Sequence, residues 1–430
     1  DALSQESGNP LSTDPDGAPA PDAGDSGADA SADAVPLDPP DLSDDAPCVE
    51  PAEVALFVTP RRPMHNAPLR IMVVTDRDIS NASIWARFPS GETRRLEARY
   101  FRGPPFAWSA VVERPGRGVY RVALTTGPEV HTCEDITMRV VRPERMVTDV
   151  VWPAEDEWSR AFENLYSAWI MQLFHAPAGE RPSWRPLHEV LRDPERNFLY
   201  NRLGMHEDGP NHRESVRATP DCADTPYYLR AYFAWKMRLP FVFSSCTRGR
   251  GGEPSTCGRP FSNVEPPEAG LREEGILQPD AGVDDLELTE PISEVVAFNR
   301  WANVTLVGTV ASGGGRTMPL DERSDFYPIE LSRESIRPGT IFVDPYGHLL
   351  VVSQWVDQTE DSPGMLYAIA GHPDLSFGRS RFRVEKRQRA AVTDQKTLPA
   401  DQTTIEVHDG PLRLDPIAGL KNETVRVHGT

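Results

Sequence analysis

The chain has 430 residues, of which 39% are hydrophobic and 26% are charged, so it is long enough for two or three folded units. The 45 basic and 65 acidic side chains give a net charge of -20. This charge argues against a general nucleic-acid-binding protein, because phosphate contacts need clustered positive charge. No apolar run approaches the roughly 20 residues of a membrane-spanning helix, which argues against an integral membrane protein.

Residues 1–47 are acidic and lack the residue types that build a core. They contain twelve Asp or Glu residues, no Lys or Arg and no aromatic residue. Such a segment cannot bury enough apolar surface to offset its chain entropy, so we predict a disordered tether. Because twelve excess negative charges lie there, the rest of the chain has a net charge of only -8. The acidity therefore says little about a binding surface.

The start of the chain also suggests processing. It begins with Asp1 rather than Met, from which we expect a chain whose export signal has been removed. A long tether rich in Ala, Pro and Asp suits an exported protein, in the periplasm or at the cell surface, that is held through a lipid or the wall. A chain cut at an arbitrary residue is the alternative.

The five cysteines suggest two disulfides and one remaining thiol. Cys246 and Cys257 flank a loop without core-forming residues, which a disulfide would hold in place. Cys48 and Cys133 bracket a strand-rich segment and could join its ends, which leaves Cys222 free. Five reduced cysteines in a cytosolic protein are the alternative. Because the sequence has no Cys-x-x-Cys or close Cys/His cluster, we predict no metal site and no cofactor.

Residues 48–143 have the pattern of an all-β unit. Short runs rich in Val, Ile, aromatic residues and Arg are separated by turn residues such as Pro89-Ser90-Gly91. Six or seven short strands in this length indicate a small β-sandwich, similar in pattern to immunoglobulin or fibronectin type III modules. The predicted strands are Val54–Thr59, Leu69–Thr75, Ser83–Phe88, Trp108–Glu113, Val119–Thr125 and Ile136–Val141.

We assign residues 150–392 to one α+β unit and residues 393–430 to a C-terminal extension. Five apolar residues from Trp158 to Leu173 recur at helical spacing and predict a helix over 157–174. The other predicted elements are short helices over 184–203, a helix over 222–239, an acidic loop over 262–290 and antiparallel strands over 340–386.

Cys222 lies at the predicted start of the helix over 222–239. Five residues from Cys222 to Met237 recur at spacings of three or four, which predicts one buried stripe. Pro226 is tolerated only near a helix start, so the sulfur falls in the first turn. There, unpaired N–H groups would stabilise a thiolate and could hold an oxyanion, although Asp221 and Asp224 act against a negative charge. A buried cysteine with no chemical role is the alternative.

A thiolate enzyme also needs a base, and His348 has the most suitable position among the histidines. It follows Gly347 as the first residue of an apolar strand, so it would lie at the rim of a sheet. A third group must accept the other ring N–H. His372 and Asp374 follow the next strand and could face the same side, and we favour Asp374 because a carboxylate also stabilises an imidazolium. A solvent-facing turn residue is the alternative for His348.

The order of these residues resembles the papain-like bacterial cell-wall cysteine peptidases and amidases of the NlpC and CHAP types. The matches over residues 195–385 are Asp221-Cys222-Ala223, Pro338-Gly339 and Gly347-His348. The resemblance implies an α+β papain-like thiol-hydrolase fold, in which a helix packs on an antiparallel sheet. It implies Cys222 as nucleophile, His348 as base and Asp374 or His372 as the group that orients the base. The implied substrate is a peptide or amide bond, often in peptidoglycan.

Some residues differ from that pattern and keep two alternatives open. Asp224 and Pro226 stand where small residues usually follow the cysteine, and 126 residues separate Cys222 from His348. A transglutaminase-like acyl transferase has the same Cys, His, Asp order. A non-enzymatic surface-binding protein with a degenerate papain-like scaffold is the second alternative.

Overall fold

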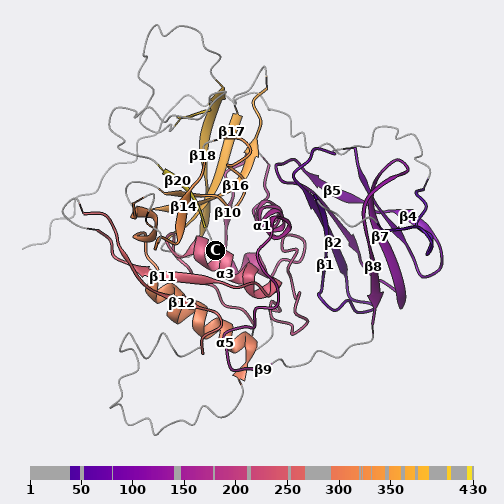
Figure 1. Cartoon of the computed structure of the whole chain (residues 1–430), viewed down its shortest axis with the longest axis horizontal. Coiled ribbons are helices and arrows are strands. Elements are labelled where there is room, and N and C mark those ends of the chain that lie inside the picture. The colour runs from indigo at the N-terminus through magenta and orange to yellow at the C-terminus, as the bar shows by residue number, and fades with distance from the viewer. Residues whose placement is uncertain are drawn as a thin grey trace, which may run out of the picture.

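A computed structural model describes residues 39–48, 53–79, 81–139, 147–177, 180–210, 215–249, 253–266, 292–318, 321, 323–330, 332–343, 348–359, 364–372, 376–386, 404–407 and 424–428. Most of the predicted tether and acidic loop lies outside these residues, and so does Asp374. The described part is a mixed α and β structure with mainly antiparallel sheets, arranged as two regions side by side (Figure 1).

The first region consists of two four-stranded antiparallel sheets packed face to face. Its strands are β1 (Val54–Thr59), β2 (Leu69–Thr75), β3 (Ser83–Arg87), β4 (Thr93–Arg95), β5 (Ala98–Phe101), β6 (Phe106–Val112), β7 (Gly118–Thr126) and β8 (Glu129–Met138). The strand orders are β1-β2-β6-β5 and β4-β3-β7-β8. Alternate residues of both sheets, such as Ile71 and Val122, form one buried core between them. The predicted β-sandwich is therefore present.

The end of the predicted tether is part of this sandwich. Leu42 is buried against Trp85, and the guanidinium of Arg121 donates hydrogen bonds to carbonyl oxygens of the same segment. The disulfide between Cys48 and Cys133 then joins the segment to β8. Residues 39–47 pack on the sandwich because one apolar side chain and the partly buried Arg121 hold an otherwise polar stretch.

The second region contains the helices. The first three are α1 (Arg160–Leu173), α2 (Leu187–Leu191) and α3 (Thr225–Met237). Helix α1 begins three residues later than predicted, because Ser159 supplies the cap by accepting the N–H of Phe162. All residues of α3 are buried, whereas the sequence predicted only one buried stripe. Helix α3 is therefore central in the core and not amphipathic.

A second group of elements lies on the side of α3 away from the main sheet (Figure 1). It comprises β9 (Val147–Thr148), β11 (Val242–Cys246), β12 (Cys257–Ser262), β13 (Ile292–Ser293), α5 (Glu294–Arg300), the π-helix η1 (Trp301–Leu306), α6 (Val307–Thr309) and the 3-10 helix η2 (Gly314–Arg316). Strands β11 and β12 form a hairpin that the second disulfide, Cys246–Cys257, closes. Both disulfides join the pairs that the spacing suggested, and Cys222 is free.

The main sheet has the strand order β10-β18-β17-β16-β15-β20-β14, with β19 beside β18. Its strands are β10 (Ser183–Trp184), β14 (Phe326–Pro328), β15 (Ile341–Val343), β16 (Leu349–Val356), β17 (Gly364–Gly371), β18 (Phe377–Lys386), β19 (Thr404–Val407) and β20 (Thr424–His428). All pairings are antiparallel except that of β18 with β19. Strands β19 and β20 come from the segment predicted to be an extension, so that segment contributes to the sheet.

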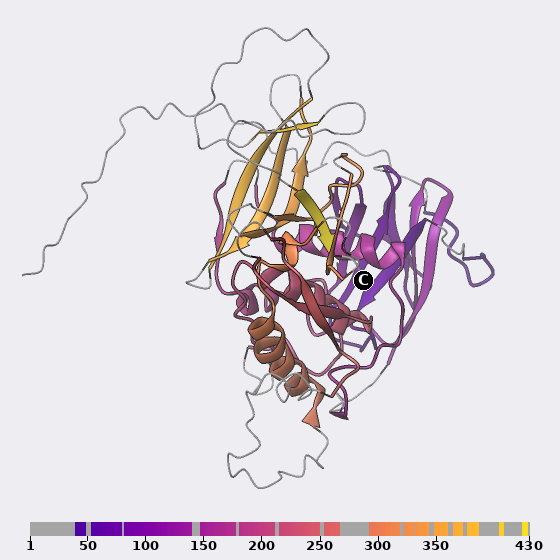
Figure 2. The ribbon, with the colours of Figure 1, turned by 60° about the vertical axis from the view of Figure 1, so that its left-hand side comes forward.

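The two faces of the main sheet have different cores. Leu349 and Val351 of β16 join the large core that contains α1 and α3, whereas Leu350 and Val352 belong to a separate cluster. Because successive side chains of a strand alternate, the second cluster lies on the face away from α3. Helix α1 lies between the main sheet and the sandwich (Figures 1 and 2), and the large core extends to Met72 of β2.

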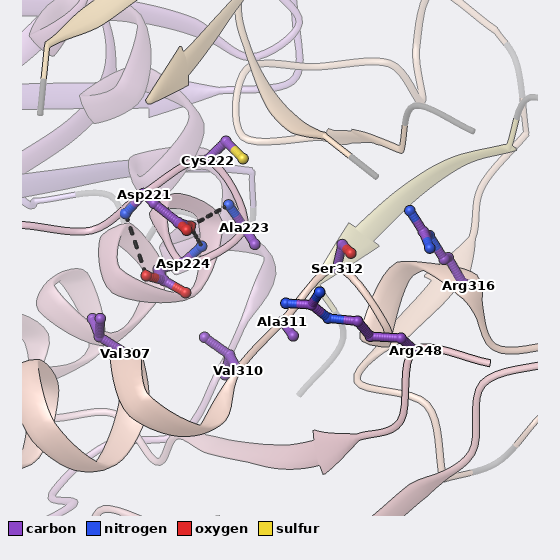
Figure 3. A pocket seen from close by; sticks show the side chains of 10 residues that line it. All are labelled: Asp221, Cys222, Ala223, Asp224, Arg248, Val307, Val310, Ala311, Ser312 and Arg316. Atoms are coloured by element: carbon purple, nitrogen blue, oxygen red, sulfur yellow. Dashed lines mark hydrogen bonds between the residues drawn. The ribbon is translucent and has the colours of Figure 1, made fainter. Parts of the chain in front are cut away.

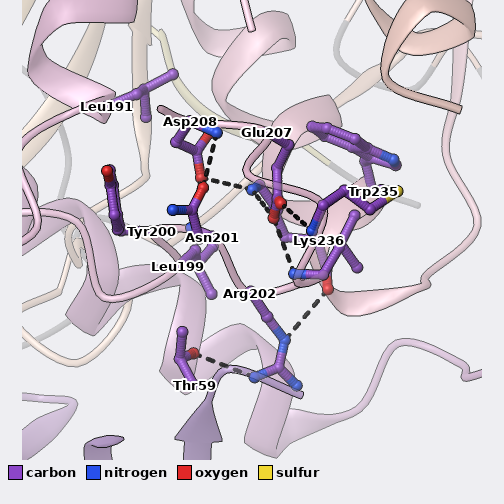
Figure 4. Close-up of polar contacts among 12 residues, drawn as sticks. Thr59, Leu191, Leu199, Tyr200, Asn201, Arg202, Glu207, Asp208, Trp235 and Lys236 are labelled. Atoms are coloured by element: carbon purple, nitrogen blue, oxygen red, sulfur yellow. Dashed lines mark hydrogen bonds and ion pairs between the residues drawn. The ribbon is translucent and has the colours of Figure 1, made fainter. Parts of the chain in front are cut away.

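A buried network of charges joins the two regions (Figure 4). The guanidinium of Arg202 donates to the carbonyl oxygen and hydroxyl at the end of β1 and to the carbonyl oxygen of Lys236. The Nζ atom of Lys236 lies 2.6 Å from both Glu207 Oε1 and Asp208 Oδ2. All three charged side chains of this last cluster are 0% exposed. The sandwich is therefore attached by packing and by charge, and not only by the chain that links it.

No helix among the described residues is long and apolar enough to cross a membrane.

Candidate functional site

Two aspartates shape the turn that leads into α3. The Oδ1 atom of Asp221 accepts the N–H groups of Ala223 at 2.7 Å and of Asp224 at 3.2 Å. In return, Asp224 Oδ2 accepts the N–H of Asp221 at 3.3 Å. This reciprocal pattern is that of a capping box. It places Cys222 in the turn before α3, but it occupies two N–H groups that the sequence suggested for an oxyanion.

The thiol of Cys222 is partly exposed and carries an unfavourable electrostatic balance. Burial raises the pKa of the thiol, and the charges of Asp221 and Asp224 raise it further. The N–H groups of Ala223 and of Cys222 itself act in the opposite direction but do not outweigh these causes. The expected stabilisation of a thiolate by backbone N–H groups is therefore outweighed by burial and by the two carboxylates.

Asp224 is the second titratable group with a shifted pKa. Burial, followed by the charge of Asp221, raises the pKa of Asp224 to about 7. Near neutral pH this carboxyl therefore exchanges between its neutral and charged forms. Two interacting groups with raised pKa values beside a pocket are typical of functional sites, although buried ion networks also produce them.

A pocket of about 570 Å³ lies beside this turn (Figure 3). This volume is within the roughly 300–1,000 Å³ of small-ligand sites. Carboxylates stand on its α3 side, two arginines on the opposite side, and the sulfur of Cys222 projects away from the carboxylates. The lining residues are Asp221, Cys222, Ala223, Asp224, Arg248, Val307, Val310, Ala311, Ser312 and Arg316.

The end of β17 contacts the same turn. A Cβ atom on Gly371 would lie 2.9 Å from Thr225 Oγ1 and 3.1 Å from the backbone carbon and oxygen of Asp221. Only glycine allows this approach without a shift of the backbone. One end of the main sheet therefore contacts the turn that contains Cys222.

The register of the sheet relates the two candidate histidines. Val351 of β16 pairs with Ile369 of β17, and Val352 pairs with Ala368. Continued toward the strand ends, this register puts His348 opposite His372. Both histidines therefore belong to the end of the sheet that meets α3.

Their side chains do not reach the pocket, because neither His348 nor His372 is among its lining residues. His372 Nε2 lies 2.6 Å from the place of a Cβ atom on Gly378, which pairs with Ala370 on the sheet face away from α3. The alternation along β16 directs His348 to that same face. The structure thus brings the strand ends to Cys222 but not the imidazoles, and Asp374 is outside the described residues.

Within the described ranges, no group of three or more His, Cys, Asp or Glu side chains is placed to hold a metal ion. No model of a known protein family matches the sequence, and a search of curated proteins finds none that is similar to it. The resemblance to papain-like peptidases therefore stays a prediction based on the Cys222 and His348 motifs.

The sequence pattern gave no reason to select Arg248 and Arg316. They lie far apart in the chain. Arg248 follows the half-cystine Cys246 by two residues, and Arg316 directly follows Gly313-Gly314-Gly315. A basic residue close to a disulfide and another directly after a run of glycines are the sequence features that could have indicated Arg248 and Arg316.

Proposed function

We propose that the protein is an exported thiol hydrolase of papain-like fold that cleaves a peptide or amide bond, with Cys222 as its nucleophile. One observation carries the proposal: the cysteine that remains outside the two disulfides lies in the turn that leads into the central helix and lines a pocket of ligand size. The contact of the sheet end with the same turn supports it. The two disulfides are compatible with export. Peptidoglycan is the substrate that the resemblance suggests.

In this mechanism His348 accepts the thiol proton while the sulfur of Cys222 attacks the carbonyl carbon of the bond. The C–N bond breaks and the amine leaves with that proton. Water then hydrolyses the thioester, which releases a carboxylic acid and restores the thiol. His372 is the described candidate to accept the other ring N–H of His348. Because both rings lie on the face away from α3, the proposal includes a rearrangement at the start of β16 when substrate binds.

The test is hydrolysis of peptidoglycan fragments, followed by mass spectrometry of the new amine and acid ends. We expect Cys222→Ala to abolish cleavage and His348→Ala to reduce it by about 10²–10⁴-fold, the usual contribution of a general base. His65→Ala, in a loop of the sandwich, is the matched control and should keep full activity. Absence of cleavage by the wild-type protein, or equal cleavage by Cys222→Ala, would refute the proposal. Incorporation of an added amine instead of water would indicate an acyl transferase.

A non-enzymatic binding protein is the second candidate, and the raised pKa of Cys222 favours it. The occupied N–H groups of Ala223 and Asp224 favour it as well, because they provide no oxyanion site. In that case the same pocket would bind peptidoglycan fragments unchanged. Binding that is equal in wild type and Cys222→Ala, without any product, would identify this function.

A further inference from the structure

We propose that Arg248 and Arg316 bind a carboxylate group of the ligand, so that the Cys222 pocket selects peptides with an acidic group beside the reacting bond. The proposal specifies the substrate of the function proposed above, and it rests on that function only where it treats the ligand as a substrate. The recognition itself depends only on the pocket, its two guanidinium groups and their surroundings.

The position of Arg316 follows from the three glycines that precede it. A Cβ atom on Gly313 would lie 2.1 Å from the carbonyl oxygen of Thr247, and one on Gly314 would lie 2.3 Å from the hydroxyl of Tyr227. A Cβ atom on Gly315 would lie 2.9 Å from Val343. Because none of these contacts leaves room for a side chain, the glycines let η2 pack against the hairpin, α3 and the sheet together. This packing fixes the place of Arg316.

The disulfide hairpin fixes the place of Arg248. Cys246 is bonded to Cys257, and the Thr247 N–H donates to the carbonyl oxygen of Thr256 at 3.0 Å. The contact between Gly313 and the Thr247 carbonyl then joins this hairpin end to the η2 turn. Two basic residues from distant parts of the chain are therefore held on the same side of one pocket.

Both guanidinium groups are available for a ligand. Among the described residues, neither Arg248 nor Arg316 makes an ion pair or a side-chain hydrogen bond with another residue. The Nε atom of Arg316 is buried and has no hydrogen-bond partner within that part of the chain. The two terminal nitrogens of Arg316 are not buried in this way, so they are the donors that a bound anion would reach. Arginine suits a carboxylate because its planar group can donate two parallel hydrogen bonds.

The opposite side of the pocket gives the ligand a direction. Asp221 and Asp224 lie there, and their charge disfavours a second carboxylate. A ligand with its acidic group at the arginines would therefore place its amide or amine end near Cys222 and α3. A pocket with separate acidic and basic sides thus fits a peptide that carries a carboxylate better than a neutral or cationic one.

The test compares two thiol reagents of similar size, iodoacetate and iodoacetamide, which differ by a negative charge. The alkylation rate of Cys222 is measured by mass spectrometry for each reagent, and their ratio is normalised to that of the urea-unfolded protein. We expect Arg248→Gln and Arg316→Gln each to lower the iodoacetate-to-iodoacetamide ratio by about threefold to tenfold, as for loss of one charge-assisted contact. Arg316→Lys, which keeps the charge, should lower it less.

Arg259→Gln is the matched control, because Arg259 is an exposed arginine of the same hairpin outside the pocket. Its ratio should equal that of wild type. Unchanged ratios in both folded pocket variants, or an equal decrease in the control, would overturn the proposal. The readout needs no hydrolysis: a lowered ratio in a protein without activity would refute the hydrolase and retain the carboxylate site. Hydrolysis by the wild-type protein, together with unchanged ratios in the arginine variants, would retain the hydrolase and refute the carboxylate site.

Discussion

Asp224 couples the charge of the pocket to pH. Its pKa of about 7 results first from burial and then from Asp221, and its ionised form adds to the causes that raise the pKa of Cys222. Below pH 7 Asp224 is mostly neutral, so mainly Asp221 opposes a thiolate. Above pH 7 both carboxylates are charged and oppose a thiolate. The thiol of Cys222 therefore becomes harder to ionise in the pH range in which an alkylating reagent would need the thiolate.

The substitution Asp224→Asn tests this coupling. The amide keeps an oxygen that can accept the N–H of Asp221 but never acquires the negative charge, so the pKa of Cys222 should fall. We expect the midpoint of the iodoacetamide rate profile at Cys222 to move to lower pH. Asp156→Asn, which changes an exposed acid outside the pocket, is the control and should leave the midpoint in place. An unchanged or higher midpoint in Asp224→Asn would contradict the coupling.

The chemistry of single residues was only partly predictable. The spacing of the other cysteines left Cys222 free, as predicted. Pro226 indicated a nearby helix start, but α3 begins at Thr225, so the sulfur lies in the preceding turn and not in the predicted first turn. The direction of the Asp221 side chain could not be derived, because a carboxylate before a helix either repels an anion or caps the backbone. In the structure Asp221 does both, which accounts for the raised pKa of the thiol and for the occupied N–H groups.

At the scale of elements, the triple glycine has a structural role that a glycine-rich turn alone would not require. The backbone of η2 approaches the end of the disulfide hairpin so closely that Gly313 excludes any side chain. The pocket therefore depends on backbone packing between η2 and β11. Gly308 of the neighbouring α6 is different, because a Cβ atom there meets nothing within 4 Å.

This difference predicts opposite effects of two Gly→Ala substitutions. Gly313→Ala should lower the free energy of unfolding by about 1–3 kcal/mol, because the methyl group would meet backbone atoms that must move. Gly308→Ala should be neutral or stabilising by up to about 1 kcal/mol, since alanine favours a helix. Denaturant unfolding measures both. Equal stabilities of the two variants would show that η2 can move away from the hairpin at little cost.

The strands that were predicted and those that were not differ in physical character. Strands β1 and β2 have the predicted bounds, because their apolar runs stand between clear turn residues, although only β2 is buried along its whole length. Strand β4 was not predicted, since Thr93–Arg95 is polar and lies at a sheet edge. Strands β19 and β20 were missed because each depends on partners far away in the sequence, which local pattern cannot reveal.

The whole molecule is held together by a core that the domain boundaries predicted from the sequence would divide. Met72 and Val74 of the sandwich belong to the same buried cluster as Trp169 of α1. Arg202 adds hydrogen bonds to β1, and its burial lowers the pKa of its guanidinium to about 10. A composition change along the chain indicated a separate β-module, but apolar residues on the outer face of a sandwich sheet require a neighbour.

The buried cluster of Lys236, Glu207 and Asp208 lies next to Arg202, which joins the two regions by its hydrogen bonds to β1. Lys236→Met would leave two buried carboxylates without their cation, which typically costs about 3–5 kcal/mol at neutral pH. Because Arg202 contacts both Lys236 and the end of β1, we expect hydrogen exchange to increase in β1 as well as in α3 (Figure 4). Arg185→Met is the control, since this exposed ion pair should contribute less than about 1 kcal/mol.

The loss of stability in Lys236→Met should increase as the pH rises. Burial already raises the pKa of Asp208 to about 6 even beside Lys236, whereas that of Glu207 is lowered, because Lys236 acts against its burial. Without Lys236 the folded-state pKa of each carboxyl should rise above its unfolded value. The neutral forms then support folding only at acidic pH, and stability is lost as the pH rises through the folded-state pKa values.

The deficit of Lys236→Met relative to wild type should therefore grow from acidic to neutral pH in urea unfolding. A deficit independent of pH would contradict this prediction, and would mean that water or another cation replaces Lys236 beside the two carboxylates.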